Sequence, residues 1–251
     1  MKSGLCSVSF RDHSLEEVVQ LTKENGLDAI EWDGKVHVPH EDLKAAKKAA
    51  RLTEEAGLAI ASYGSYYIAG STEPFQGVLR TAQELNTDMI RIWAGDMGSD
   101  EVDQAKFDMI VRDVKLNAHL AQNLGITLSF EYHSNTLTDT PGSAIKLLEA
   151  VAEPNVKLYW QPAESLTFGQ RIASLPLLKP WLTNIHVFHW KDYHTRYSLD
   201  EGIDEWIPYF EQLSPSSASE RYALLEFVKD DSPEQLKQDA KVLKSFLHDN
   251  E

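Results

Sequence analysis

The feature of this 251-residue chain that most limits its fold is an alternation, repeated eight times, of a short apolar run with a longer stretch of helical period. The short runs are rich in Ile, Val, Leu or aromatic residues, which is typical of strands. We expect strands near Gly4–Phe10, Ala29–Trp32, Leu58–Tyr63, Asp88–Trp93, Ile126–Tyr132, Val156–Gln161, Ile185–His189 and Tyr222–Val228.

The longer stretches carry the punctuation of helices. Three of them end at a glycine, Gly26, Gly57 or Gly125, which provides the left-handed stop that a helix needs before the chain turns back. We expect helices over Ser14–Glu24, Glu41–Ala56, Pro74–Leu85, Glu101–Leu124, Gly142–Ala152, Ser165–Ala173, Gly202–Gln212 and Ser232–His248.

Eight strand–helix alternations indicate one closed barrel. A single (β/α)8 barrel usually takes about 250 residues, whereas a doubly wound sheet more often stops at about five or six strands. We therefore predict one α/β domain over residues 1–251, with an active site at the carboxyl ends of the strands. The low-complexity stretch Ser214–Ser219 is expected in the loop before the last strand.

Composition limits the possible partners. The net charge is −15 and the sequence has no Lys/Arg cluster, which argues against a nucleic-acid partner. No apolar run approaches the roughly 18 residues of a membrane span, and the N-terminus lacks the apolar core of a signal peptide. The single cysteine, Cys6, fits a reducing compartment and is more typical of a small buried side chain than of a nucleophile. We expect a cytoplasmic protein that acts on a small molecule.

Polar residues close several of the predicted strands. Alternate side chains of a barrel strand face its interior, so strand parity predicts that a polar set lies inside near the carboxyl ends. This set is Arg11, Glu31, Tyr63, Arg91, Trp93, Glu131, Gln161, His189 and Glu226. Burying an unpaired polar group costs on the order of 2–7 kcal/mol, so these groups need a ligand or one another.

Two explanations of the polar set remain open. The glutamates, the histidine and the amide are oxygen and nitrogen donors suited to one divalent ion such as Mn²⁺, Mg²⁺, Co²⁺ or Zn²⁺. Alternatively, Glu31, Glu131 and Glu226 pair with Arg11 and Arg91 in a purely structural network. The combined placement on neighbouring strands favours a functional site.

Five segments in this order resemble a known family. They are Ala29-Ile30-Glu31-Trp32 followed by Val36-His37, Ile90-Arg91-Ile92-Trp93, Ser129-Phe130-Glu131-Tyr132-His133, His189-Trp190-Lys191-Asp192 and Leu225-Glu226-Phe227. With these motifs the chain resembles, over essentially its whole length, the xylose isomerase-like TIM-barrel superfamily. That superfamily contains sugar isomerases and epimerases, inosose dehydratases and endonuclease IV, and its members are commonly dimers or tetramers, so a homo-oligomer is possible.

The resemblance implies a set of metal ligands at the ends of strands five to eight. Mapped onto this sequence, the ligands are Glu131, Gln161, His189 and Glu226. The family usually has an aspartate where Gln161 stands, and a neutral amide leaves only two carboxylates to balance the cation; Glu164 is the alternative ligand. His189 is preferred to His186 because His-Trp-Lys-Asp resembles the family's ligand-bearing His-x-Lys-Asp segment, which leaves His186 as a packed histidine.

The resemblance also implies proton movement next to a carbonyl through an enediolate. A metal polarises the carbonyl, while Glu131 and Glu226 act as ligands and as acid and base; His37 is a further candidate for proton exchange with a substrate oxygen. Aromatic and charged side chains are expected to bind the substrate and to orient its hydroxyls, a carboxylate or a phosphate. These are Arg11, Glu31, Tyr63, Arg91, Trp93, Lys191 and Arg196.

Three functional interpretations follow. The leading one is a metal-dependent isomerase or epimerase of a sugar or related polyol. The second is a dehydratase or lyase of a keto-polyol, which shares the metal and the first proton abstraction but then expels a β-hydroxyl. The third is a barrel without catalytic activity that binds a sugar or a protein partner. Fold and metal set do not identify the substrate, because barrel loops vary independently of the scaffold.

Overall fold

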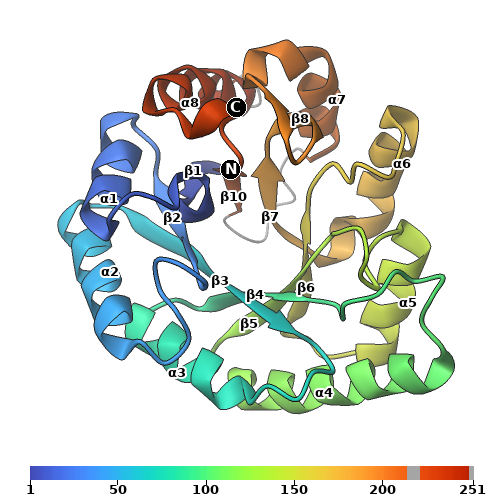
Figure 1. Cartoon of the computed structure of the whole chain (residues 1–251). Helices are drawn as coiled ribbons and strands as arrows, with labels where there is room; N and C mark the ends of the chain where they lie inside the picture. The colour runs from blue at the N-terminus through green and yellow to red at the C-terminus, as the bar shows by residue number, and fades with distance from the viewer. Residues whose placement is uncertain (214–220, 249–251) are drawn as a thin grey trace.

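The protein is a closed (β/α)8 barrel, as predicted (Figure 1). The computed structural model describes residues 1–213 and 221–248. In these residues eight parallel strands close in the order β1-β10-β7-β6-β5-β4-β3-β2. The strands are β1 (Lys2–Cys6), β2 (Ala29–Asp33), β3 (Ala59–Ile68), β4 (Met89–Trp93), β5 (Thr127–Glu131), β6 (Val156–Trp160), β7 (Leu182–Val187) and β10 (Tyr222–Leu225).

Helices surround the barrel on the outside (Figure 1). They are α1 (Leu15–Glu24), α2 (Leu43–Glu55), α3 (Phe75–Leu85), α4 (Gln104–Gln122), α5 (Pro141–Val151), α6 (Phe168–Leu178), α7 (Ile203–Leu213) and α8 (Pro233–His248). Short 3-10 turns are η1 (Ser7–Phe10), η2 (Lys179–Trp181), η3 (Leu199–Gly202) and η4 (Lys229–Asp231). The predicted loop Ser214–Ser219 lies outside the described residues.

Local sequence signals explain where several helices begin and end. Ser14 and Glu17 form a reciprocal capping box at the start of α1. Gly26, Gly57 and Gly125 all have positive φ, after α1, α2 and α4, as their positions predicted. Helix α6 starts later than predicted, because Thr167 rather than a residue near Ser165 caps it.

An antiparallel hairpin follows β7 and was not predicted. It consists of β8 (His189–Asp192) and β9 (Thr195–Tyr197). The Asp192 carboxylate accepts hydrogen bonds from the backbone N–H groups of His194 and Thr195, at 3.0 and 2.9 Å, and so fixes the turn. The prediction that the seventh strand continues to His189 was therefore wrong, since the chain leaves the barrel after Val187.

A bulge in β3 changes which of its side chains face the interior. Ile30 of β2 pairs with Ile60, but the next residue, Glu31, pairs with Ser62. The extra residue turns Ser62 inward and Tyr63 outward. The prediction that Tyr63 faces the interior was wrong, because its hydroxyl donates to the Val38 carbonyl oxygen at 2.8 Å in the layer between barrel and helices.

The main hydrophobic core lies between the strands and the helices. Trp32 and Trp160 are fully buried there. Each indole N–H donates to a helix hydroxyl at 3.1 Å, Trp32 to Thr53 and Trp160 to Ser174, so neither ring leaves an unsatisfied donor. The helices are thereby fixed on the barrel that carries the polar strand ends.

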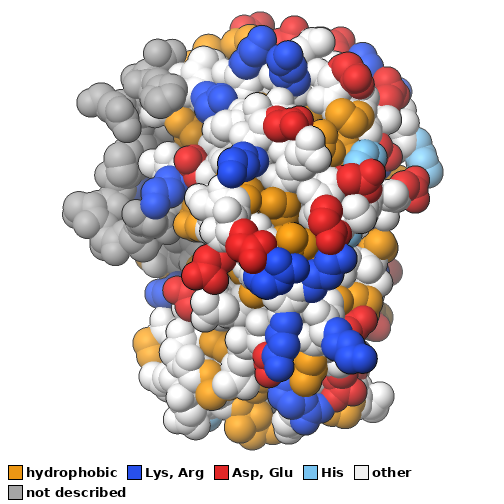
Figure 2. Space-filling model, turned by 90° about the vertical axis from the view of Figure 1, so that its left-hand side faces the viewer, with side chains coloured by type: hydrophobic (Ala, Val, Ile, Leu, Met, Phe, Trp, Pro, Cys, Tyr) orange, Lys and Arg blue, Asp and Glu red, His pale blue; other side chains and the backbone are white. Residues whose placement is uncertain are grey.

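Figure 2 views the molecule from the side of α1 and α2. Basic and acidic side chains are interspersed on this face, and ion pairs join neighbouring helices, such as Lys48 with Glu16 at 2.7 Å. No helix in the described part of the chain is long and apolar enough to cross a membrane.

Replacement of Leu128 by alanine tests the assigned core. Leu128 on β5 is fully buried, so Leu128→Ala should lower the free energy of unfolding by about 2–5 kcal/mol. Leu116→Ala on α4 is the matched control, because that side chain is 60% exposed and its loss should change stability by about 0.5 kcal/mol or less. Urea unfolding followed by circular dichroism measures both. Equal losses would contradict the assignment of Leu128 to the core.

Candidate active site

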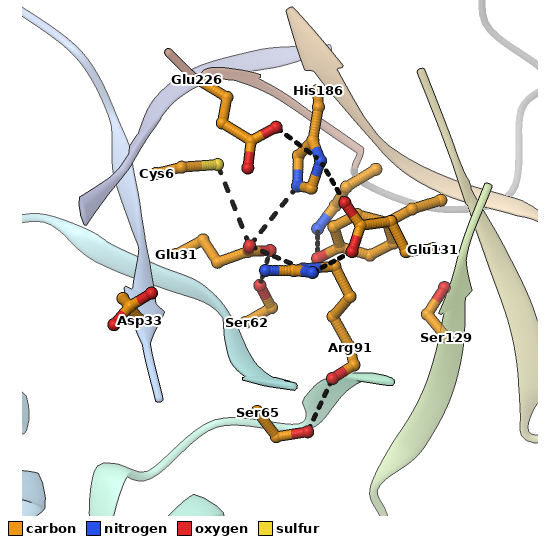
Figure 3. A network of polar contacts seen from close by, with 12 residues as sticks. Cys6, Glu31, Asp33, Ser62, Ser65, Arg91, Ser129, Glu131, His186 and Glu226 are labelled. Carbon is orange, nitrogen blue, oxygen red and sulfur yellow. Dashed lines mark hydrogen bonds and ion pairs between the residues drawn. The ribbon is translucent and has the colours of Figure 1, made fainter. Parts of the chain in front are cut away.

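A cluster of buried charged side chains occupies the barrel interior near the carboxyl ends of the strands (Figure 3). Glu31 comes from β2, Arg91 from β4, Glu131 from the end of β5 and His186 from β7, and Glu226 directly follows β10. All five are at most 4% exposed. They converge because strand ends far apart in sequence open onto one mouth of a barrel.

Arg91 bridges two of the carboxylates. Its Nε donates to Glu31 Oε1 at 2.9 Å, and its Nη1 donates to Glu131 Oε2. Ser62 Oγ donates to the other oxygen of Glu31 at 2.6 Å, and Trp93 Nε1 donates to Glu131 Oε2 at 2.6 Å. The pairing of Glu31 and Glu131 with Arg91 is the one that the structural-network explanation predicts.

His186 is the histidine at the centre of the cluster. Its Nδ1 lies 2.9 Å from Gln161 Oε1, 3.2 Å from Glu226 Oε2 and 3.6 Å from Glu131 Oε1. On the other side of the ring, Nε2 lies 3.4 Å from Glu31 Oε1. The three oxygen-bearing residues of the predicted ligand set therefore converge on one imidazole nitrogen.

His189 does not occupy this position, contrary to the sequence prediction. Within β7, Asn184 and His186 face the interior, whereas Ile185 and Val187 belong to the core on the helix side. His189 opens the hairpin instead, where its ring packs on Tyr197 at a centroid distance of 5.4 Å. In the set of four ligands predicted at the ends of strands five to eight, His186 thus replaces His189 as the candidate nitrogen ligand.

The carboxylates of the cluster differ in acidity. Burial opposes ionisation of Glu31 and Glu131, but Arg91 and His186 together with their hydrogen bonds outweigh it, so the pKa of Glu31 is about 2 and that of Glu131 lies well below its usual range. For Glu226, burial raises the pKa to about 7; His186 opposes the rise and Glu131 adds to it. A carboxyl group with a pKa near neutrality suits reversible proton transfer.

The pKa of His186 is raised well above its usual value. Burial acts to lower it, but the charge of Glu226, with further contributions from Cys6 and Glu31, outweighs burial. In the absence of another cation, the imidazole is therefore the group that balances these carboxylates together with Arg91.

A cavity of about 290 Å³ opens above the cluster. Arg91, Glu131, Gln161 and Glu226 line it, together with an aromatic wall that includes Tyr66, Trp93, Trp190 and Phe227. Arg11 and Lys35 add two exposed cationic side chains at the rim. A larger hollow of about 1340 Å³ is lined by residues from the amino ends of the strands, such as Met89 and Thr127, and holds none of the clustered carboxylates.

Of the predicted site residues, several line the cavity and others lie elsewhere. The lining includes Arg11, Arg91, Trp93, Glu131, Gln161 and Glu226, and also the alternative ligand Glu164, whose side chain is exposed. Arg11 donates to the Tyr193 hydroxyl at 2.8 Å and so takes no part in the carboxylate pairing proposed for it. Glu31 lies within the cluster.

Three further predicted residues lie away from the cavity lining. His37 is buried, its Nε2 lies 3.1 Å from the His13 carbonyl oxygen, and burial lowers its pKa. Arg196 donates to Asp231 at 2.6 Å, and Lys191 is exposed on the hairpin. The structure thus separates His37, Lys191 and Arg196, as well as Tyr63, from the carboxylate cluster.

The sequence analysis did not identify Lys35, Tyr66 and His186 as site residues. Lys35 Nζ lies 4.4 Å from the centre of the Tyr66 ring, which also contacts the Arg91 guanidinium at 5.0 Å. Tyr66 has a φ of 57°, a strained conformation for a bulky side chain, at a second register shift in β3. No local sequence signal reveals that shift. His186 was missed because the seventh strand was expected to reach His189 with that residue inside, which places His186 on the opposite face, whereas β7 ends at Val187.

The cluster fits a divalent cation. One ligand atom each from Glu131, His186 and Glu226 lie within 4.8 Å of one another, and Gln161 Oε1 adjoins them. Octahedral coordination at about 2.1 Å places neighbouring ligands about 3 Å apart, close to the distances around His186 Nδ1. Glu226 Oε2 is buried without a hydrogen-bond partner among the described residues. With Glu226 ionised and His186 neutral, three carboxylates face one guanidinium, and one divalent cation offsets the excess charge.

The barrel fold and this cluster at the strand ends are typical of TIM-barrel proteins, whose active sites lie at the carboxyl ends of the strands. Residues 19–246 match the family model described as xylose isomerase-like TIM barrel. The chain belongs to this family, which confirms the resemblance seen in the sequence.

Relatives with described activities include a dehydratase and epimerases. The chain is 27% identical over 199 residues to a 3-dehydroshikimate dehydratase of Bacillus anthracis, covering 74% of this chain and 71% of the relative. The structure of the probable 3-DHS dehydratase AsbF of Bacillus anthracis superposes with a TM-score of 0.81 at 24% identity, over 97% of this chain and 99% of that one.

Two epimerase structures have the same fold. A D-psicose 3-epimerase superposes with a TM-score of 0.73 at 17% identity, over 100% of this chain and 99% of that one. The 3-keto-D-glucoside 4-epimerase YcjR of E. coli superposes with a TM-score of 0.71 at 14% identity, over 99% of each chain. At these identities the likeness establishes the fold.

Removal of Arg91 tests the buried ion pairs. Arg91→Met leaves Glu31 and Glu131 buried without their cation, so the free energy of unfolding should fall by about 3–5 kcal/mol. Arg51→Met is the matched control, because Arg51 pairs with Glu55 on the surface of α2 and surface pairs contribute little. Thermal unfolding compares the two variants, and an Arg91 variant as stable as the Arg51 variant would contradict this role.

Proposed function

We propose that this protein is a divalent-metal-dependent dehydratase of a cyclic hydroxy ketone that carries a carboxylate, with 3-dehydroshikimate as the substrate to test first. The observation that carries the proposal is the arrangement of Glu226, a buried carboxyl group with a pKa near neutrality, beside His186 and Glu131 at the floor of the cavity. The 27% identity to a 3-dehydroshikimate dehydratase supports the choice of substrate.

Glu131, Gln161, His186 and Glu226 would hold the metal ion. A divalent ion bound there supplies Lewis acidity, which polarises a substrate carbonyl and acidifies the neighbouring C–H bond. Side chains of the protein carry out the remaining steps.

Glu226 removes the proton from the carbon next to the ketone. The electron pair of that C–H bond forms a new C=C bond as the C–O bond of the β-hydroxyl breaks, and the hydroxyl leaves with the proton from Glu226 as water. The two rim cations, Arg11 and Lys35, bind the substrate carboxylate, and Tyr66 and Trp93 pack against the ring. From 3-dehydroshikimate, loss of water leaves a ring that tautomerises to an aromatic dihydroxybenzoate.

Epimerisation or isomerisation of a keto-sugar, the leading interpretation of the sequence, is the second candidate. It shares the first proton abstraction but returns a proton to carbon, for which two-base enzymes need a second protonated group. Glu131 suits that role poorly, because Arg91 holds its pKa well below the usual range. Two rim cations also favour an anionic substrate over a neutral sugar.

Dehydration by the metal-loaded protein is the direct test. Chelator-treated protein should be inactive, and added Mn²⁺ or Mg²⁺ should restore formation of dihydroxybenzoate, followed by its ultraviolet absorbance. Glu226→Gln should lower turnover by about 10²–10⁴-fold, the usual contribution of general acid–base catalysis. Glu164→Gln, at the exposed edge of the cavity, is the control and should retain turnover.

Other outcomes would contradict the proposal in distinct ways. Metal-dependent exchange of substrate C–H for deuterium in keto-sugars, with no water lost, would establish the epimerase. A wild-type protein that binds no divalent metal would support the binding barrel without catalytic activity. Loss of activity in Glu164→Gln would indicate that Glu164, rather than Gln161, is the fourth ligand of the metal.

Recognition of the substrate carboxylate gives a second prediction. Arg11→Gln should raise KM by about 10- to 100-fold with little change in kcat, since a hydrogen bond to a charged group contributes about 1.5–3 kcal/mol. On the carboxamide analogue of the substrate, the same variant should have the KM and kcat of wild-type protein. Equal effects on the acid and the amide would show that Arg11 does not recognise the carboxylate.

A further inference from the structure

We propose that the barrel holds a second cation position, formed by Cys6, Glu31 and His186, which takes a thiophilic divalent ion such as Zn²⁺, Cd²⁺ or Co²⁺. It lies on the Nε2 side of the His186 ring, whereas the Glu131–Glu226 position lies on the Nδ1 side. The inference goes beyond the proposed function, since it concerns which ions the protein binds and where, whatever reaction it catalyses.

The three donor atoms lie near the separations that tetrahedral coordination requires. Cys6 Sγ lies 3.9 Å from Glu31 Oε1, His186 Nε2 lies 3.4 Å from the same oxygen, and all three atoms lie within 4.8 Å of one another. Bond lengths of about 2.3 Å for sulfur and 2.0–2.1 Å for nitrogen and oxygen give tetrahedral edges of roughly 3.6 Å for S···O and 3.4 Å for N···O. A small contraction about the cation would complete the geometry.

An independent observation points to a ligand at this position. His186 is fully buried, and its Nε2 has no hydrogen-bond partner among the described residues. This nitrogen faces Glu31 and Cys6, as Figure 3 shows for the Glu31 carboxylate. A buried ring nitrogen without a hydrogen bond is costly, and a bound cation would satisfy it.

The chemistry of the donors selects the kind of ion. A thiol, an imidazole and one carboxylate form a softer set than the two carboxylates, the amide and the imidazole on the other face. Burial raises the pKa of the Cys6 thiol, so the ion must displace the thiol proton to solvent as it binds. Zn²⁺, Cd²⁺ and Co²⁺ bind thiolates strongly enough to do so, whereas Mg²⁺ and Mn²⁺ prefer oxygen ligands.

Occupation of the two positions is expected to be mutually exclusive. Both use His186, through Nε2 for the thiophilic ion and Nδ1 for the oxygen-preferring ion, and a neutral imidazole has one nitrogen lone pair to donate. Two divalent ions would also bring more positive charge than the cluster can balance, because Arg91 already neutralises part of its negative charge. A thiophilic ion at Cys6 therefore excludes the ion at Glu131 and Glu226.

The single cysteine makes the test specific. The chelator-treated full chain is titrated with Co²⁺, and the near-ultraviolet charge-transfer band from thiolate to cobalt is recorded. Since Cys6 is the only cysteine of the sequence, any such band reports Cys6. We expect wild-type protein to develop the band to saturation with one equivalent of Co²⁺, and Cys6→Ser and Cys6→Ala to bind Co²⁺ without it. Mn²⁺ binding by both variants verifies that they are folded.

Competition provides a second readout. In wild-type protein, Cd²⁺ should displace bound Mn²⁺, as measured by the electron paramagnetic resonance signal of free Mn²⁺. Cys6→Ser should need at least about tenfold more Cd²⁺, since loss of even an outer partner of a ligand costs about 10–100-fold in affinity.

Failure of this inference is distinguishable from failure of the proposed function. Stoichiometric Co²⁺ binding by wild-type protein without a charge-transfer band, or absence of Co²⁺ binding, would overturn the second position. Mn²⁺-dependent dehydration would then still establish the enzyme. Conversely, a band that depends on Cys6 in a protein without Mn²⁺-dependent dehydration would overturn the proposed function and leave the second position intact.

Discussion

The buried pairing of Arg91 with Glu31 and Glu131 is the interaction on which the centre of this barrel depends. Burial opposes ionisation of each carboxylate, but one guanidinium bonded to both, together with the nearby His186, keeps them ionised. The backbone accommodates the pair as well, since a Cβ on Gly64 would lie 2.8 Å from Arg91 Nη2 and 3.0 Å from Glu31 Oε1. The ion pairs thus leave Glu226 as the carboxyl group whose proton is exchangeable near neutral pH.

Strand parity predicted the interior positions wherever the strand is regular. Arg91 and Glu131 on β4 and β5, and Gln161 after β6, face the interior as the alternation requires. Parity failed at β3, where an extra residue turns Tyr63 outward, and no residue type near Ile60 marks the bulge. The length of the seventh strand was also misjudged, because Phe188 continues the apolar run beyond Val187, where β7 ends.

The His-Trp-Lys-Asp motif did not indicate which histidine lies among the carboxylates. His-Trp-Lys-Asp resembles the ligand-bearing segment of the family, but the interior position depends on where β7 ends, and β7 ends at Val187. His186 is one residue before that end, on the same face as Asn184, whose amide donates to the buried Tyr159 hydroxyl at 2.6 Å. The end of β7, rather than the motif, therefore decides which histidine lies among the carboxylates.

The proposed catalytic and recognition residues come from different parts of the chain. The proton-carrying and ligand groups lie on or directly after barrel strands, whose register is fixed by the closed sheet. The cavity wall comes from irregular segments: Tyr66 at a strained bulge, Lys35 in the loop after β2, and Trp190 on the hairpin. Strand periodicity predicts the residues on the strands but does not predict those of the irregular segments. The class of chemistry can therefore be inferred from the sequence, whereas the shape and charge of the substrate require the three-dimensional arrangement of these loops.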